Sequence, residues 1–105
     1  MAETLAKLEQ TIIARRDGDP SSSYVARLFA SGRAKIAQKV GEEAVETVIA
    51  AMAADRGALV SESADLLFHL GVLLAEQGLS FKDVLAELDR REGVSGIAEK
   101  AARKD

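Results

Sequence analysis

Residues 39–46 read Lys-Val-Gly-Glu-Glu-Ala-Val-Glu, and residues 62–65 read Glu-Ser-Ala-Asp. In each stretch one carboxylate follows another by three residues: Glu43 and Glu46, then Glu62 and Asp65. Residues three apart share one face of a helix, because each residue turns the chain by about 100°. If both stretches are helical and antiparallel, four carboxylates converge, and their repulsion requires a cation between them. The predicted occupant is a divalent metal with oxygen ligands.

The helices predicted around these stretches extend well beyond them. Apolar positions recur with a helical period over residues 33–54 and again over residues 58–77, with a turn expected at residues 55–57 and Gly78 closing the second helix. Three shorter helices are expected at residues 4–16, 24–30 and 81–91, the last with Ser80 as N-cap and Asp83 completing a capping box. No strand-like alternation competes with this pattern. The sequence therefore predicts an all-α bundle of four to five helices.

The polar stripe on the second long helix is narrow. Glu62, Asp65, His69 and Glu76 fall within about 60° of one another, and almost all the remaining positions are apolar. Carboxylates walled in by large apolar side chains are partly desolvated, at several kcal/mol or more per unpaired ion, so they need a cation to stay ionised. The breadth of the apolar surface at residues 58–75 also predicts that a second subunit covers part of it. We expect a homodimer that completes the bundle.

Composition narrows the class of protein. The chain has 105 residues, 48% of them apolar and 30% charged, which is typical of one soluble domain spanning residues 1–105, with about residues 93–105 as a loosely ordered tail. A net charge of -3 argues against a nucleic-acid partner, and the absence of cysteine excludes disulfides and Cys-ligated zinc. No apolar run approaches the roughly 18 residues of a membrane span, and residues 1–9 lack a signal-peptide pattern. A cytoplasmic protein without a membrane partner is expected.

The donor atoms of the cluster point to phosphate chemistry. Oxygen-only ligands favour Mg²⁺, with Mn²⁺ as the alternative, over zinc. Mg²⁺ usually bridges to substrate phosphates and stabilises the charge that develops on them. The sequence contains no P-loop and no G-x-G-x-x-G motif, and its single histidine makes a nucleophilic triad improbable.

Two neighbouring residues have open interpretations. Lys39 lies one turn before Glu43, where it would form either an ordinary ion pair worth about 0.3–0.5 kcal/mol or a contact with a substrate phosphate. His69 lies one turn after Asp65, and a single histidine on a mostly buried helix is more often hydrogen-bonded within the protein than a ligand. Metal ligation or a substrate contact by His69 is the alternative.

The pattern Glu42-Glu43-x-x-Glu46 followed by Glu62-x-x-Asp65 resembles the signature of the all-α nucleotide pyrophosphohydrolases, the MazG-like superfamily. Further segments are similar to the phosphoribosyl-ATP pyrophosphohydrolase family: Ser23-Tyr24, Leu28-Phe29, Gly32, residues 39–44, residues 64–70, Arg90-Arg91, Ser95-Gly96 and Glu99-Lys100. The resemblance covers residues 5–103. One departure is Gln38, which stands where the family frequently has lysine.

The resemblance implies Mg²⁺-dependent hydrolysis of phosphoribosyl-ATP to phosphoribosyl-AMP and pyrophosphate, the second step of histidine biosynthesis. It implies that Glu43, Glu46, Glu62 and Asp65 are the metal ligands. Taken with the analysis of the residues above, the predicted catalytic residues are Glu42, Glu43, Glu46 and Lys39, and the predicted substrate contacts are Lys39, His69, Arg90 and Arg91. Glu42, the first glutamate of the motif, is expected to activate water or to shape the site.

Two alternatives remain open at this point. A housecleaning pyrophosphohydrolase of the same superfamily, acting on other nucleoside triphosphates, would have an identical metal site. A non-catalytic helical dimer could instead use the acidic stripe to bind a structural cation or a basic partner. Pyrophosphate release in the presence of Mg²⁺ separates the second alternative from both enzymes.

Overall fold

The computed structural model describes residues 1–93, which form five helices and contain no strand. The helices are α1 (Ala2–Arg15), α2 (Tyr24–Ser31), α3 (Arg33–Met52), α4 (Arg56–Glu76) and α5 (Phe81–Arg91). The predicted all-α fold is confirmed. The tail expected at residues 93–105 lies outside the described residues, apart from Gly93.

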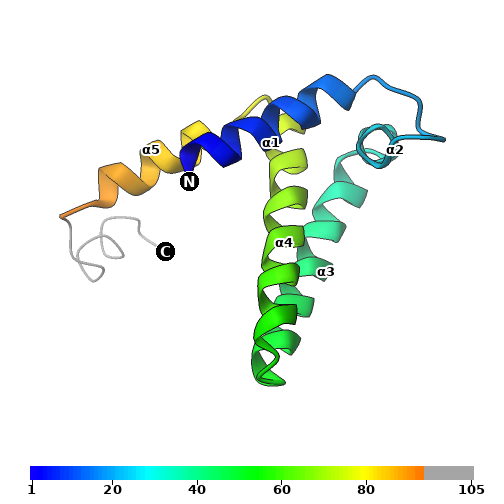
Figure 1. The fold of residues 1–105 in the computed structure, drawn as a ribbon. Helices are drawn as coiled ribbons and strands as arrows, with labels where there is room; N and C mark the ends of the chain where they lie inside the picture. The colour runs from blue at the N-terminus through cyan, green and yellow to red at the C-terminus, as the bar shows by residue number, and fades with distance from the viewer. Residues whose placement is uncertain (94–105) are drawn as a thin grey trace.

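A long antiparallel hairpin of α3 and α4 is the centre of the fold (Figure 1). In Figure 1, α1 crosses one end of this hairpin, α2 packs at the same end, and α5 continues past α1 away from α3 and α4. Apart from its junction with α4, α5 packs mainly against α1. One end of the hairpin is therefore covered by other helices, and the other end has no covering helix among residues 1–93.

The turn between α3 and α4 differs from the one predicted. We expected residues 55–57 to lie outside both helices, but Arg56 and Gly57 belong to α4. The Asp55 side chain accepts a hydrogen bond from the Ala58 amide at 3.0 Å, which caps the helix two residues earlier than predicted. The chain reverses at Ala54, whose φ of 58° is uncommon for a residue other than glycine.

The hydrophobic core lies at the covered end, where α1, α2, α3 and α4 meet. Ile12, Ile36 and Val72 are fully buried there. Gly71 allows the close approach of the helices: a Cβ at this position would lie 2.9 Å from Phe81 Cε2 and 3.0 Å from Ile12 Cδ1. The core thus fixes α1 and the start of α5 against the C-terminal half of α4.

Capping fixes the ends of α4 and α5. Gly78 follows α4 with a φ of 74°, as the sequence predicts for a closing glycine. The capping box formed by Ser80 and Asp83 is present, and the Phe81 amide donates to Glu9 Oε1 at 2.8 Å. This last bond ties the first turn of α5 to α1.

Among the described residues α4 is the one helix long and apolar enough to cross a membrane, by length and composition alone. The central helix of a soluble bundle passes the same test. Only 22% of the most apolar window of α4 is buried, and the same helix carries Glu62 and Asp65 beside α3.

Candidate active site

Three of the four predicted carboxylates come together between α3 and α4. Oxygen atoms of Glu43, Glu62 and Asp65 all lie within 4.8 Å of one another. Glu43 comes from the middle of α3, and the other two lie one turn apart on α4. The antiparallel packing of the two helices is what brings these three side chains to one point.

Glu46 borders this cluster one turn beyond Glu43. Its carboxyl group is close enough to raise the pKa of both Glu43 and Glu62. Together with Glu62 it lines a cavity of about 280 Å³ that opens between α3 and α4 toward their turn. The fourth predicted carboxylate therefore lies at the edge of the cluster.

Burial leaves two carboxylate oxygens of the cluster unsatisfied. Glu43 is only 7% exposed, and Oε2 of Glu43 and Oε2 of Glu62 are buried without a hydrogen-bond partner. Burial, followed by the neighbouring Glu46, raises the pKa of Glu43. For Glu62 the hydrogen bond with Glu46 is the larger cause of the raised pKa, and burial adds to it. Buried carboxylate oxygens that lack hydrogen-bond partners are suited to ligate a hard divalent cation.

Lys39 and Glu42 lie beside the cluster on α3. The Lys39 Nζ is 3.3 Å from Glu42 Oε1 and 3.8 Å from Glu43 Oε1, so the ion pair considered from the sequence is present. Gln38 Nε2 donates to Glu42 Oε2 at 2.7 Å. The hydrogen bonds from Gln38 and Lys39 lower the pKa of Glu42, which stays ionised. The hydrogen bond to Glu42 is also the main reason that the pKa of Lys39 is raised.

His69 is held within the protein on both sides. It is 5% exposed, and its Nδ1 lies 2.8 Å from the Asp65 carbonyl oxygen. Because a carbonyl only accepts, Nδ1 carries the proton, and Nε2 accepts from the Tyr24 hydroxyl at 2.8 Å. Both ring nitrogens of His69 are therefore hydrogen-bonded within the protein.

Tyr24 is a site neighbour that the sequence analysis noted in a family-like segment but gave no role. Its hydroxyl lies 2.8 Å from His69 Nε2, and so joins α2 to α4 beside Asp65. Tyr24 is the first residue of α2, after the N-cap Ser23. Capping predicts where α2 begins, but not that α2 docks beside the carboxylates, so the family-like segment Ser23-Tyr24 was the one signal for this residue.

Arg90 and Arg91 lie at the end of α5. Both pair with Glu87, at 2.7 and 2.9 Å, and these hydrogen bonds lower the pKa of Glu87 to about 2. Since α5 leads away from α3 and α4 (Figure 1), the structure does not bring these arginines to the carboxylates of their own chain. Glu76, the last residue of the polar stripe on α4, forms an ion pair with Arg33 at 2.8 Å.

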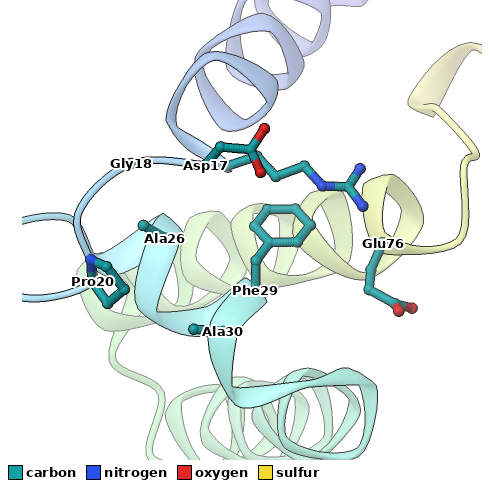
Figure 2. Close-up of a pocket in the computed structure, with 8 residues that line it drawn as sticks. Asp17, Gly18, Pro20, Ala26, Phe29, Ala30 and Glu76 are labelled. Carbon is teal, nitrogen blue, oxygen red and sulfur yellow. The ribbon is translucent and has the colours of Figure 1, made fainter.

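A pocket at the C-terminal end of α4 is separate from the cluster. It has a volume of about 350 Å³, and Figure 2 shows Phe29 and Glu76 at its edge. The Arg16 guanidinium lies 4.8 Å from the centre of the Phe29 ring and donates to the Ala75 carbonyl at 3.4 Å. These contacts cap the end of α4 and fasten α1 to α2.

Comparison with known proteins places this arrangement in a family. The sequence profile described as phosphoribosyl-ATP pyrophosphohydrolase matches residues 5–92, which include all the carboxylates of the cluster. The chain belongs to the phosphoribosyl-ATP pyrophosphohydrolase family. The resemblance stated from the motifs is therefore confirmed.

Proteins of this family that are named phosphoribosyl-ATP pyrophosphatase are similar over almost their whole length. The protein from Rhizorhabdus wittichii is 73% identical, over 98% of this chain and 97% of its own. The protein from Novosphingobium aromaticivorans is 67% identical, over 98% and 96%. The protein from Zymomonas mobilis is 65% identical, over 96% and 94%.

Proposed function

We propose that this chain hydrolyses phosphoribosyl-ATP to phosphoribosyl-AMP and pyrophosphate, the second step of histidine biosynthesis. Membership of the family and relatives of that name at 65–73% identity support the activity. The observation that carries the site assignment is the meeting of Glu43, Glu62 and Asp65 with two buried oxygens that lack partners. Such a cluster is unfavourable in a folded protein unless a cation compensates its charge.

Mg²⁺ is the proposed cation, with Mn²⁺ as a substitute. Glu43, Glu62 and Asp65 would hold it, and Glu46 would complete the set from the edge of the cluster. When bound, a hard divalent ion neutralises phosphate oxygens and makes a nearby water more acidic. These carboxylates fit that ion because all their donor atoms are oxygens.

Lys39 and Glu42 are the proposed catalytic neighbours. The Lys39 ammonium group lies at the rim of the cluster, where it can bind a phosphate oxygen in exchange for its present ion pairs. Glu42 stays ionised because Gln38 and Lys39 stabilise its charge, so it is able to accept a proton from an attacking water. That water forms a bond to the α-phosphorus of the triphosphate. The bond from this phosphorus to the α–β bridging oxygen breaks, and pyrophosphate leaves with that oxygen.

The other predicted substrate contacts, His69, Arg90 and Arg91, would reach the substrate through another residue or from a second copy of the chain. His69 is buried, so we propose that it acts through Tyr24, whose hydroxyl it holds. Arg90 and Arg91 lie on α5, which leads away from the carboxylates of the same chain. A contact of either arginine with substrate would have to come from α5 of a second copy.

The proposed assembly is a homodimer of a cytoplasmic, single-domain chain. Large apolar side chains are exposed on the uncovered half of the hairpin, on α3 as well as on α4: Val45, Val48, Ile49, Met52, Val60 and Leu67. From the sequence we expected the interface at residues 58–75, and we propose that the second half of α3 also belongs to it. Packing two hairpins through this surface would complete a four-helix bundle.

A substrate panel tests the proposed activity. The purified protein is incubated with phosphoribosyl-ATP and, separately, with common and damaged nucleoside triphosphates, with and without Mg²⁺, and pyrophosphate is measured. We expect phosphoribosyl-ATP to give the highest kcat/KM. Preference for another triphosphate would favour the housecleaning alternative, and no pyrophosphate from any substrate would favour the non-catalytic dimer.

A further inference from the structure

A second pocket lies one helical turn from the acidic cluster. It has a volume of about 580 Å³ and is enclosed by the end of α1, the loop before α2, the first residues of α2 and one residue of α4. That volume is in the range of about 300–1,000 Å³ typical of small-molecule sites. Its polar and aromatic lining comes from Arg15, Asp19, Ser22, Ser23, Tyr24 and Phe68.

The pocket is connected to the cluster through α4 and Tyr24. Phe68 follows Asp65 by three residues, a rise of about 4.5 Å along the helix. The hydroxyl of Tyr24 donates to His69, which in turn donates to the Asp65 carbonyl. A ligand that fills this pocket can therefore extend to the carboxylates over a short distance.

The aromatic wall of the pocket suits a nucleobase. The rings of Tyr24 and Phe68 are stacked, with centroids 6.0 Å apart and an angle of 22° between their planes. Tyr24 is 43% exposed, so part of its surface remains open to a further ring. Stacking on such a wall is a common way to hold a purine.

Arg15 is an unengaged cation at the pocket. Its guanidinium makes no hydrogen bond and no ion pair within residues 1–93, whereas the guanidinium groups of neighbouring arginines are occupied: Arg16 by the Ala75 carbonyl, Arg27 by the Pro20 carbonyl and Arg33 by Glu76. The Asp19 carboxylate nearby is already bonded to the Ser21 amide and hydroxyl. An exposed guanidinium without partners is suited to a phosphate.

We propose that this pocket binds the phosphoribosyl-adenine end of the substrate while the acidic cluster takes the triphosphate. Arg15 contacts the phosphate of the phosphoribosyl group, and Tyr24 stacks on the adenine. The inference rests on the proposed function, because phosphoribosyl-ATP, unlike ATP, carries a phosphate on its phosphoribosyl group as well as the triphosphate. It makes Arg15 the residue that distinguishes phosphoribosyl-ATP from ATP.

Calorimetric titration of the metal-free protein with phosphoribosyl-AMP and with AMP tests the pocket apart from catalysis. Phosphoribosyl-AMP keeps the groups assigned to the pocket and lacks the pyrophosphate. We expect the unmodified protein to bind it at least about tenfold more tightly than AMP, the contribution of one charge-assisted phosphate contact. In Arg15→Gln this preference should disappear.

Lys7→Gln is the matched control, because Lys7 is exposed on the same helix two turns away and the change also removes one positive charge. It should keep the tenfold preference. Equal affinities of the unmodified protein for the two ligands, an unchanged preference in Arg15→Gln, or the same loss in Lys7→Gln would each overturn the inference.

Steady-state kinetics distinguishes a failure of the pocket proposal from a failure of the proposed function. With phosphoribosyl-ATP and Mg²⁺, Arg15→Gln should raise KM about tenfold or more and leave kcat within a few-fold. Turnover by the unmodified protein together with an unchanged KM in Arg15→Gln would reject the pocket and leave the proposed function standing. No turnover by the unmodified protein would reject the proposed function itself.

Discussion

Glu43 shows how one residue combines the features of the site. It is a buried carboxylate on α3 whose Oε2 has no hydrogen-bond partner, and burial and Glu46 raise its pKa. In an ordinary structural position such a group would be paired. Its environment is explained if a cation supplies the missing partner.

Neutralising one carboxylate should separate function from stability. Glu46→Gln and Asp65→Asn keep the shape of the side chain and remove one negative charge each. We expect turnover to fall about 100-fold or more, because metal-ion stabilisation of the transition state is worth several kcal/mol. The melting temperature of the metal-free protein should stay the same or rise, since like-charge repulsion is relieved.

Glu3→Gln is the control, since Glu3 is exposed in the first turn of α1 and far along the chain from the cluster. It should change neither turnover nor stability appreciably. If the carboxylates form only a paired structural face, the two site variants should instead lose stability and keep full activity.

The pH dependence of metal binding follows from the raised pKa values of Glu43 and Glu62. A carboxylic acid with a raised pKa stabilises the metal-free fold below its ordinary value of 4.5, and this contribution is lost as the pH rises through the raised pKa. Mg²⁺ requires the ionised form, so it binds more tightly as the pH rises over the same window.

The rise in melting temperature caused by a fixed Mg²⁺ concentration should therefore increase from about pH 4.5 upward and then level off. Thermal scans with and without Mg²⁺ at each pH measure it. A stabilisation by Mg²⁺ that is as large at pH 4 as at pH 8 would contradict the assignment of these two carboxylates.

At the scale of helices, periodicity and capping predicted most of the fold. They located α2 and α5 to within a residue, and they placed the carboxylates of α3 and α4 on facing sides. The turn predicted at residues 55–57 was misplaced, because Asp55 acts as an N-cap, Arg56 and Gly57 belong to α4, and the chain reverses at Ala54.

Contacts between helices distant in the sequence could not be predicted. The Tyr24–His69 hydrogen bond depends on where α2 docks, and the position of Arg90 and Arg91 depends on α5 following α1. Local patterns contain no information on either arrangement. Spacing predicts which carboxylates face one way, but packing decides which other residues surround them.

The close approach at Gly71 gives a test of helix packing. In Gly71→Ala the new Cβ would crowd Phe81 and Ile12, at distances of 2.9 and 3.0 Å, so neighbouring side chains must shift. We expect the free energy of unfolding to fall by about 1–3 kcal/mol, measured by chemical denaturation, even though alanine is the better helix former.

Gly57→Ala is the matched control on the same helix. Its Cβ would have Asp55 Oδ1 as its nearest neighbour at 3.8 Å, an ordinary contact, so stability should stay the same or rise by up to about 1 kcal/mol. Equal effects of the two substitutions would show that Gly71 is not needed for close packing.

At the scale of the whole molecule, the covered and uncovered ends of the hairpin differ. The core gathers α1, α2 and the start of α5 at one end, whereas apolar side chains remain exposed at the other. Exposed apolar surfaces of this kind are common at sites of protein–protein contact. The proposed dimer would cover it.

Val60→Asp tests this interface, because Val60 is 72% exposed and lies on the uncovered half of α4. Sedimentation at micromolar concentration should show a dimer for the unmodified protein and a shift toward monomer in the variant, since a buried unpaired charge opposes association. Leu88→Asp, an exposed apolar position on α5, is the control and should leave the dimer intact. A fully active monomeric unmodified protein would contradict the proposed assembly.

The central claim is that the carboxylates between α3 and α4 hold a metal ion needed to hydrolyse phosphoribosyl-ATP. Its most direct test is pyrophosphate release from phosphoribosyl-ATP by protein treated exhaustively with a chelator, before and after Mg²⁺ is added back. The account predicts no turnover without the metal, recovery on addition of Mg²⁺, and no recovery in Asp65→Asn. Full turnover after chelation, or full recovery in Asp65→Asn, would contradict it.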